Sequence, residues 1–433
     1  MRFGWLLLGL LFVSVQAADK PLVELPNPLS LEAALTLADV NHPDIELAQA
    51  HLAAARANAK AARAQTGIDI TSEIKPQYID PASAGPNTTD SQAHLIVTKR
   101  LFDFGRSRAQ RRASDKQVEG RQLALLNTRQ QHHLEVMRRY FEVLLADMRY
   151  QVDNEVMTHA YGRYDRVRQR HKQGRISAVD LAASETRYQE FLVLRTESEL
   201  RQYSTRVMLA MSLNRPDSLP EDLTAPLLNG NDRKPPELER FLKSALKSNP
   251  DVQRLKEEVA SAEQALKAAK GQGRPTLDAE FQVSAYERNI GSRDNARASL
   301  KLRVPIYRGG RNRSAVARAN AMLQQKRAEL NKAKFDLRQS ALILVQQLEI
   351  LKISRQAART RADYRELYLD RSRALYEMEA QVSLGDAMTR MTEAQWQAAK
   401  VEFDLALVWA RVSALEGTLL NQNSGMVPTE KTP

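Results

Sequence analysis

Two long stretches of this chain, one in each half, contain almost no residue that breaks a helix. The first, residues 105–174, has no proline and contains only Gly120 and Gly162 between its ends. The second, residues 310–378, has no proline and no glycine after its first residue. Because a helix rises ~1.5 Å per residue, about 70 residues form a rod on the order of 100 Å long. The sequence therefore predicts an elongated molecule.

The two stretches belong to an internal repeat. The segment LADVNHPDIELAQA around Pro43 recurs as LKSNPDVQRLKEE around Pro250, and Leu101 matches Ile306. Each copy is predicted to contain a helix, two strands and a long helical hairpin. The predicted boundaries are 18–213 for the first copy (strands at about 67–103, helical hairpin at 104–213), 214–236 for a proline-rich linker, 237–420 for the second copy (strands at about 275–307, helical hairpin at 309–420), and 421–433 for a mobile tail.

Alternation of apolar and polar residues marks the strands. Every second residue is apolar in 277–285 and in 296–306, and the alternation is rougher in 68–78 and 93–101. A small soluble sheet with one wet face explains this pattern on its own. Strands of this length also match the ~9 to 11 residues that a tilted strand uses to cross a bilayer. Since four strands are too few to close a barrel, a membrane location requires several chains to pool their strands.

The N-terminus predicts export. Arg2 precedes an apolar run, WLLLGLLFVSV, and Val15-Gln16-Ala17 fits a cleavage site, so residues 1–17 are predicted to be a signal peptide. Export disfavours nucleic acid as the partner of a chain with a formal charge of +12. The chain has no cysteine, which excludes disulfides, thiolate metal sites and a lipid anchor on cysteine.

The remaining motifs do not predict an enzyme, a cofactor or a metal site. A third glycine is absent after Gly271-Gln272-Gly273, and no phosphate-binding loop or metalloprotease motif is found. His132 and His133 are neighbours that point apart on a helix, so an ordinary surface pair is expected there.

Each long helical stretch is interrupted once, at a matching place. The first interruption is RHKQGRISAVDL, in which Gly174 is expected to end one helix in the left-handed conformation and Ser177 to cap the next. The second lies in LYEMEAQVSLGDAMTRM. A heptad seam that favours coiled helix packing consists of Leu337, Ala341, Leu344, Leu348 and Leu351.

The order helix, strand, strand, helical hairpin, written twice, resembles that of the TolC-type outer-membrane efflux proteins of Gram-negative bacteria. The most specific pieces are RPTLDAEF, VPIYRGG and RHKQGRISAVDL, and the resemblance covers about residues 29–420. It implies a mainly α fold with a membrane β-barrel. Three chains with four strands each would form a 12-stranded barrel in outer-membrane lipid, continued by a coiled-coil tunnel of long helices through the periplasm.

The resemblance also implies a function and partners. Such homotrimers are passive exit ducts for small toxic compounds or secreted proteins. They work with a periplasmic adaptor and an inner-membrane pump of the RND or ABC type, and they bind no nucleic acid. The transported substrate and the particular pump do not follow from this sequence.

The implied gate lies at the inner ends of the helical hairpins. Matching the family pattern places its aspartate at Asp180 and its tyrosine at Tyr376. The second copy departs from that pattern, with Glu379 in place of a glycine and Gln381 in place of an arginine. Gly385 and Met388 stand where the family has acidic residues, so Glu379 or the nearby Asp386 is expected to substitute for them.

Two further groups of residues have roles implied by the resemblance. The chain passes from barrel to tunnel at KRLFDFG and VPIYRGG, where the bend is expected at Gly105, Pro305, Gly309 and Gly310. The turn of the first helical hairpin, with Arg170, Gly174 and Arg175, is the expected docking site for the adaptor.

Two other functions compete with an exit duct. A periplasmic coiled-coil adaptor also has a signal peptide and long helices, but it has one hairpin, and the twofold repeat argues against it. An exported protein that binds polyanions would be soluble without detergent and would lose affinity steeply with salt.

Overall fold

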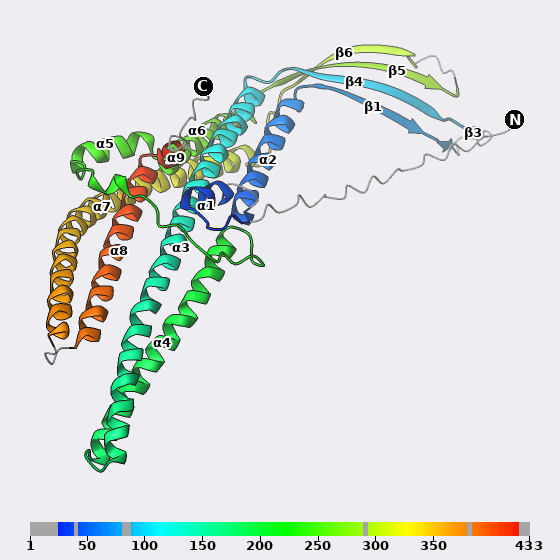
Figure 1. Ribbon diagram of the computed structural model, residues 1–433. Helices are drawn as coiled ribbons and strands as arrows, with labels where there is room; N and C mark the ends of the chain where they lie inside the picture. The colour runs from blue at the N-terminus through cyan, green and yellow to red at the C-terminus, as the bar shows by residue number, and fades with distance from the viewer. Residues whose placement is uncertain (1–24, 39–41, 80–87, 289–292, 379–382, 424–433) are drawn as a thin grey trace, which may run out of the picture.

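The two stretches without helix breakers each form one continuous helix. α3 spans Arg106–Lys172 and α7 spans Arg311–Glu377, and each contains 67 residues. Each is followed by an antiparallel partner, α4 (Ala178–Ser212) after α3 and α8 (Leu384–Leu415) after α7. In Figure 1 the molecule is elongated, with the sheet at one end and the ends of the two helical hairpins at the other.

The computed structural model describes residues 25–38, 42–79, 88–288, 293–378 and 383–423. The predicted signal peptide and most of the predicted tail lie outside these ranges. Within them, no helix combines the length and the apolar character that crossing a bilayer requires.

Shorter helices precede the strands in both copies. Pro43 and Pro250 lie in the first turns of equivalent helices, where a missing backbone N–H removes no hydrogen bond. The bounds of the shorter helical elements are α1 Leu31–Ala38, α2 Pro43–Ala64, η1 Asn229–Asp232, α5 Leu238–Ser248, α6 Pro250–Gly271 and α9 Leu419–Asn423.

Strands from the two copies share one antiparallel sheet. Its order is β1 (Ile68–Lys75), β4 (Gln92–Phe102), β5 (Thr276–Tyr286) and β6 (Ala296–Arg303). The central pair, β4 and β5, joins the first copy to the second. The strands β2 (Tyr78–Ile79) and β3 (Thr88–Thr89) pair separately. The predicted fold class, mainly helical with four strands and an internal repeat, is confirmed.

Two apolar cores hold the helices together, one of them within the second copy. The predicted heptad seam on α7 is confirmed, because Leu337, Ala341, Leu344 and Leu348 are buried and Leu351 packs against them. Fully burying one leucine side chain contributes roughly 1.5 to 3 kcal/mol. A second core forms where α1, α3, α4 and α8 meet, and its members include Leu35, Val136, Phe141, Leu209 and Phe403.

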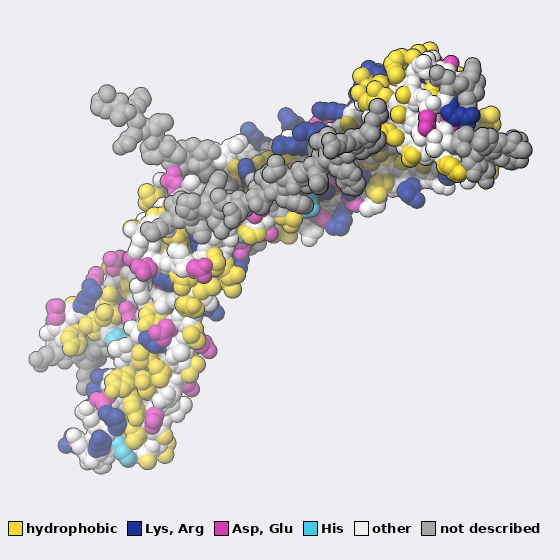
Figure 2. Space-filling view, turned by 90° about the vertical axis from the view of Figure 1, so that its right-hand side faces the viewer, with side chains coloured by type: hydrophobic (Ala, Val, Ile, Leu, Met, Phe, Trp, Pro, Cys, Tyr) yellow, Lys and Arg dark blue, Asp and Glu magenta, His cyan; other side chains and the backbone are white. Residues whose placement is uncertain are grey.

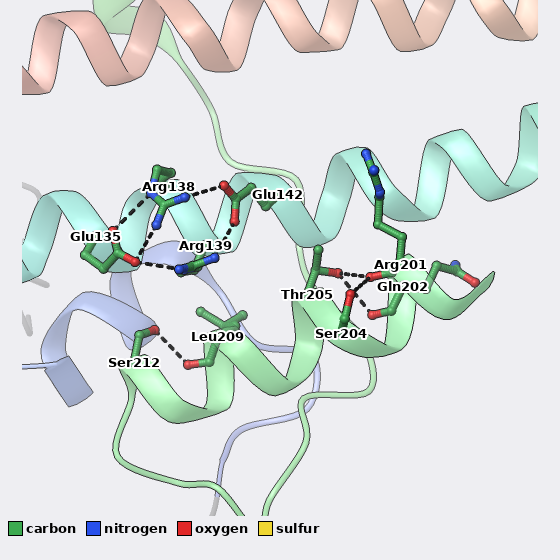
Figure 3. A network of polar contacts seen from close by, with 10 residues as sticks. All are labelled: Glu135, Arg138, Arg139, Glu142, Arg201, Gln202, Ser204, Thr205, Leu209 and Ser212. Atoms are coloured by element: carbon green, nitrogen blue, oxygen red, sulfur yellow. Dashed lines mark hydrogen bonds and ion pairs between the residues drawn. The ribbon is translucent and has the colours of Figure 1, made fainter. Parts of the chain in front are cut away.

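Two glutamates and two arginines of α3 form ion pairs with one another. Glu135 binds Arg138 at 2.5 Å and Arg139 at 2.8 Å, and Glu142 binds the same two arginines, as Figure 3 shows. Partial burial raises the pKa of Glu135, but the hydrogen bonds from the arginines outweigh it, and its pKa lies below the ordinary value. The network therefore stabilises the fold at neutral pH and weakens as the pH falls through the carboxylate range.

Tyr140 holds two chain segments against α3. Its buried hydroxyl lies 2.8 Å from the carbonyl oxygen of Leu29 and 2.6 Å from that of Thr224. The same segments bond to each other, because the amide of Thr224 donates to Leu29 and the amide of Leu29 donates to Asp222. Burial raises the pKa of Tyr140 to about 12, so the hydroxyl remains a donor at neutral pH.

Replacing Tyr140→Phe is expected to lower the free energy of unfolding by about 0.5 to 1.5 kcal/mol, because the buried hydroxyl that bonds to the carbonyl oxygens of Leu29 and Thr224 is lost. Denaturant unfolding followed by circular dichroism measures this loss. Tyr203, which is exposed on α4, provides the control, and Tyr203→Phe is expected to have no effect. Equal stability of the two variants would contradict the role given to Tyr140.

Candidate functional site

One face of the sheet is apolar and uncovered. A row across all four strands consists of Ile70, Val97, Phe281 and Ala298, which are paired in register. Figure 2 shows hydrophobic side chains gathered over the sheet end of the molecule. The large exposed side chains of this face are Ile68, Ile70, Ile74, Leu95, Phe281, Val283, Leu300 and Leu302.

The opposite face of the sheet is polar and internally paired. Arg100 lies 3.0 Å from Asp278, and Lys301 lies 2.6 Å from Glu280, each across neighbouring strands. Nδ1 of His94 lies 2.9 Å from the hydroxyl of Ser284. A sheet with one apolar and one polar face suits a boundary between lipid and an aqueous channel.

The passage from sheet to long helix depends on glycines in the left-handed region. Gly105 (φ 82°) precedes α3, and Gly310 (φ 79°) precedes α7 at the equivalent position. Gly309 also has a positive φ of 55°. Pro305 lies in the segment between β6 and these glycines. These left-handed glycines lie at the two junctions that the sequence analysis singled out.

Asp103 is a junction residue that the sequence analysis missed. Its buried carboxylate accepts hydrogen bonds from the amide and the hydroxyl of Ser107, which satisfies donors in the first turn of α3. The aspartate of KRLFDFG, four residues before a serine, was the available signal.

The turn of the first helical hairpin has the predicted caps. Gly174 adopts a φ of 70°, and the amide of Arg175 donates to the carbonyl oxygen of Arg170 at 3.0 Å. Ser177 caps α4 by accepting from the amide of Asp180 at 3.1 Å, and its hydroxyl donates to the Asp180 carboxylate at 2.7 Å. Arg170, Arg175 and Asp180 are all exposed at this end.

The end of the second helical hairpin is less completely described. Tyr376 is 60% exposed near the end of α7. Asp386 lies in the first turn of α8, where its carboxylate binds Arg390 at 2.9 Å. Glu379 and Gln381 lie outside the described residues.

Asp180 and Tyr376 are not brought together within one chain. They lie at the ends of different helical hairpins, and these ends stand apart in Figure 1. The carboxylate of Asp180 instead bonds to its neighbour Ser177. A contact between Asp180 and Tyr376 therefore requires a second copy of the chain or a different position of the helical hairpins.

The interpretation of His132 and His133 as a surface pair is wrong. Both are buried, and the ring of His132 lies against that of His42, tilted by 33°, with centroids 3.9 Å apart. α8 and the start of α2 pack against this part of α3, which local sequence does not reveal. Among the residues that the structure describes, no cluster of three or more histidines and carboxylates is arranged to hold a metal ion.

Comparisons with known proteins agree with this architecture. The family model for outer membrane efflux proteins matches residues 34–210. The fold matches the Campylobacter jejuni CmeC outer membrane channel with a TM-score of 0.75 and 13% identity, over 93% of this chain and 90% of that one. Among curated proteins, none matches the sequence at a significant level.

Two further solved structures have the same fold. The open state of the Neisseria gonorrhoeae MtrE outer membrane channel matches with a TM-score of 0.72 and 17% identity, over 90% of this chain and 89% of that one. The outer membrane protein VceC from Vibrio cholerae matches with a TM-score of 0.67 and 14% identity, over 91% of this chain and 95% of that one. The fold is thus that of outer-membrane channels, and residues 34–210 match the outer membrane efflux protein family.

Replacing Gly310→Ala is expected to lower the free energy of unfolding by about 1 to 2 kcal/mol, because an L-residue is strained at this φ. The same change at Gly105 is expected to have a similar effect. Gly120→Ala is the matched control: this glycine lies inside α3 with room for a Cβ, so alanine is expected to stabilise the helix. Denaturant titration distinguishes the two signs, and stabilisation at Gly310 would refute the strain argument.

Proposed function

We propose that three copies of this chain form a passive exit duct, gated at its periplasmic end. The chain is a channel component of an efflux system in the outer membrane of a Gram-negative bacterium. In this arrangement the channel is a homotrimer, compounds leave the cell through it, and its gate lies at the periplasmic end. The comparisons give no support to a periplasmic adaptor.

The observation that carries the proposal is the uncovered apolar face of the sheet with its two open edges. In the strand order, β1 and β6 each have a neighbour on one side only. In hydrocarbon an unpaired backbone group costs several kcal/mol, so both edges require partners. Pairing β6 of one copy with β1 of the next satisfies them, and three copies give a closed barrel of 12 strands, as the family resemblance implies.

Lys99 is consistent with this placement. It is the charged member of a row that contains Ile68, Ala279 and Leu300 on the apolar face, whose one other polar residue is Ser72 of β1. This row starts at the first residue of β1, on the side where the chain arrives from α2. A lysine near the edge of the hydrocarbon can extend its ammonium group into the interface.

The partners in this proposal are a periplasmic adaptor and an inner-membrane pump, which supplies the energy. The exposed turn with Arg170, Gly174 and Arg175 is the proposed docking site for the adaptor. The proposed gate consists of Asp180, Tyr376, Glu379, Gln381 and Asp386, with Asp180 meeting a neighbouring copy.

The membrane face is tested by two adjacent residues that point to opposite sides of β1. Ile70→Lys is expected to prevent stable insertion, because a lysine facing lipid costs roughly 2 to 4 kcal/mol at the bilayer midplane. Thr71→Lys, on the polar face between Asp69 and Glu73, is expected to insert normally. Cell fractionation and sizing in detergent measure both. Recovery of the unmodified protein as a soluble monomer would overturn the proposed function.

The gate is tested by conductance in planar bilayers. Asp180→Ala is expected to raise single-channel conductance, because it removes a charged hydrogen-bonding partner from the inner end, a contribution of ~1.5 to 3 kcal/mol. Ser177→Ala is the control, since it removes the helix cap and keeps the carboxylate. If Asp180→Ala and Ser177→Ala had equal conductance, Asp180 would act only in the cap of α4 and would not hold the gate.

A further inference from the structure

The apolar face of the sheet ends in a row of large side chains at the junction with the helices. Phe102 of β4 is paired in register with Leu277 of β5, which is paired in turn with Leu302 of β6. Because alternate residues of a strand share a face, Leu277 lies on the same face as Phe281. The register shift between Arg100 and Phe102 brings Phe102 onto this face as well.

Phe104 continues the apolar face past the end of the sheet. Its ring lies edge-on to that of Phe102, with centroids 4.8 Å apart, and both side chains are about half exposed. The backbone of Phe104 has a φ of 54°, a left-handed conformation that a bulky residue rarely adopts. In this conformation an aromatic ring lies on the apolar side of the junction, and aromatic rings gather where a barrel passes from hydrocarbon to water.

Phe104 also lines a groove of about 280 Å³ between the start of α3 and the end of α6. Positively charged side chains line much of the rest of this groove, and no carboxylate of the described residues does so. In Figure 2, Lys and Arg side chains border the hydrophobic side chains of the sheet end. The cations that line the groove, all exposed, are Arg108, Arg112, Lys267, Lys270 and Arg274.

These five cations differ from their neighbours on the same helices in having no ion-pair partner within the described part of the chain. One turn beyond the groove on α3, Lys116 lies 2.6 Å from Glu119 and 2.9 Å from Glu257 of α6. Further from the sheet on α6, Arg254 lies 2.6 Å from Glu258. Positive charge is therefore left uncompensated at the sheet end of the two helices, where it attracts an anion.

The groove lies away from the places where copies of the chain would meet. α2 packs against α3, and α7 packs against α6, so that α2 and α7 flank the groove helices. The open edge strands continue these flanking helices, because β1 follows α2 and β6 precedes α7. Copies that pair at their open edges would thus meet beside α2 and α7, and the groove would remain accessible.

We propose that this groove binds the phosphate group of an anionic phospholipid in the membrane leaflet that faces the periplasm. The lysines and arginines donate charged hydrogen bonds to the phosphate oxygens. The acyl chains extend past Phe104 along the apolar face of the sheet. The proposal rests on the proposed function, which places the sheet in the membrane and the long helices in the periplasm.

The aromatic rings favour a lipid over a soluble anion as the occupant. A free phosphate ion would use the cations alone and would leave Phe102 and Phe104 exposed to water. A phospholipid uses both parts, because its charged headgroup and its apolar chains follow each other in the same order as the groove and the apolar face.

Titration of lipid into detergent-solubilised trimers, followed by native mass spectrometry, tests the proposal. Dioleoyl phosphatidylglycerol is expected to bind more tightly than dioleoyl phosphatidylcholine, which has the same chains and no net charge. Combining Lys267→Gln with Lys270→Gln is expected to weaken phosphatidylglycerol binding roughly 25-fold, because each cation near an anionic lipid strengthens binding about fivefold. Binding of phosphatidylcholine is expected to stay unchanged.

The matched control combines Lys243→Gln with Lys247→Gln. These lysines are exposed on α5, which lies far from the sheet in Figure 1, and their replacement changes the net charge by the same amount. This control is expected to bind phosphatidylglycerol as the unmodified protein does. Combining Arg108→Gln with Arg112→Gln removes two cations from the opposite wall and provides a second test where the first variant assembles poorly.

The outcomes separate the lipid site from the proposed function. Equal affinity for the two lipids would overturn the site, and so would equal losses in the groove and control variants, since overall charge would then explain the binding. Inorganic phosphate that bound as tightly as phosphatidylglycerol would make the occupant a soluble anion and overturn the assignment to lipid. Recovery of the protein as a soluble monomer would overturn the proposed function, whereas a conducting trimer without a preference for phosphatidylglycerol would overturn the lipid site alone.

Discussion

Backbone hydrogen bonding at the two open edges of the sheet is the constraint on which the rest of this structure depends. One face of the sheet is apolar and meets no helix, so water is a poor solvent for it. Lipid accepts that face but cannot bond to the edges of β1 and β6. In a membrane the sheet is therefore stable only as part of a closed assembly. In such an assembly the long helices that follow the strands of each chain lie side by side.

The features that sequence predicted are those set by short-range chemistry. Helices without breakers, the left-handed glycine at 174, the cap at Ser177 and the heptad seam each depend on a few neighbouring residues. The apolar face of the sheet could be predicted from the alternation of apolar and polar residues, because successive side chains of a strand point to opposite sides.

Contacts between distant segments could not be predicted in the same way. Nothing near Tyr140 in the sequence indicates that it meets Leu29 and Thr224. The burial of His132 and His133 follows from the way other segments fold onto α3. Gly385 lies against the ring of His159, a residue more than two hundred positions earlier, so a single sequence gives no sign of this contact.

Because β4 pairs with β5, the two free edges of the sheet in each chain are different. One edge is β1 from the first copy of the repeat, and the other is β6 from the second copy. Two identical edges cannot be matched by rotating one chain onto another with all helices on the same side. Only a heterologous, head-to-tail contact of β6 with β1 repeats around a common axis, and such contacts generate rings of cyclic symmetry when the rotation closes. In the proposed trimer, the fusion of two copies into one chain thus halves the number of strand pairings that must form between separate molecules.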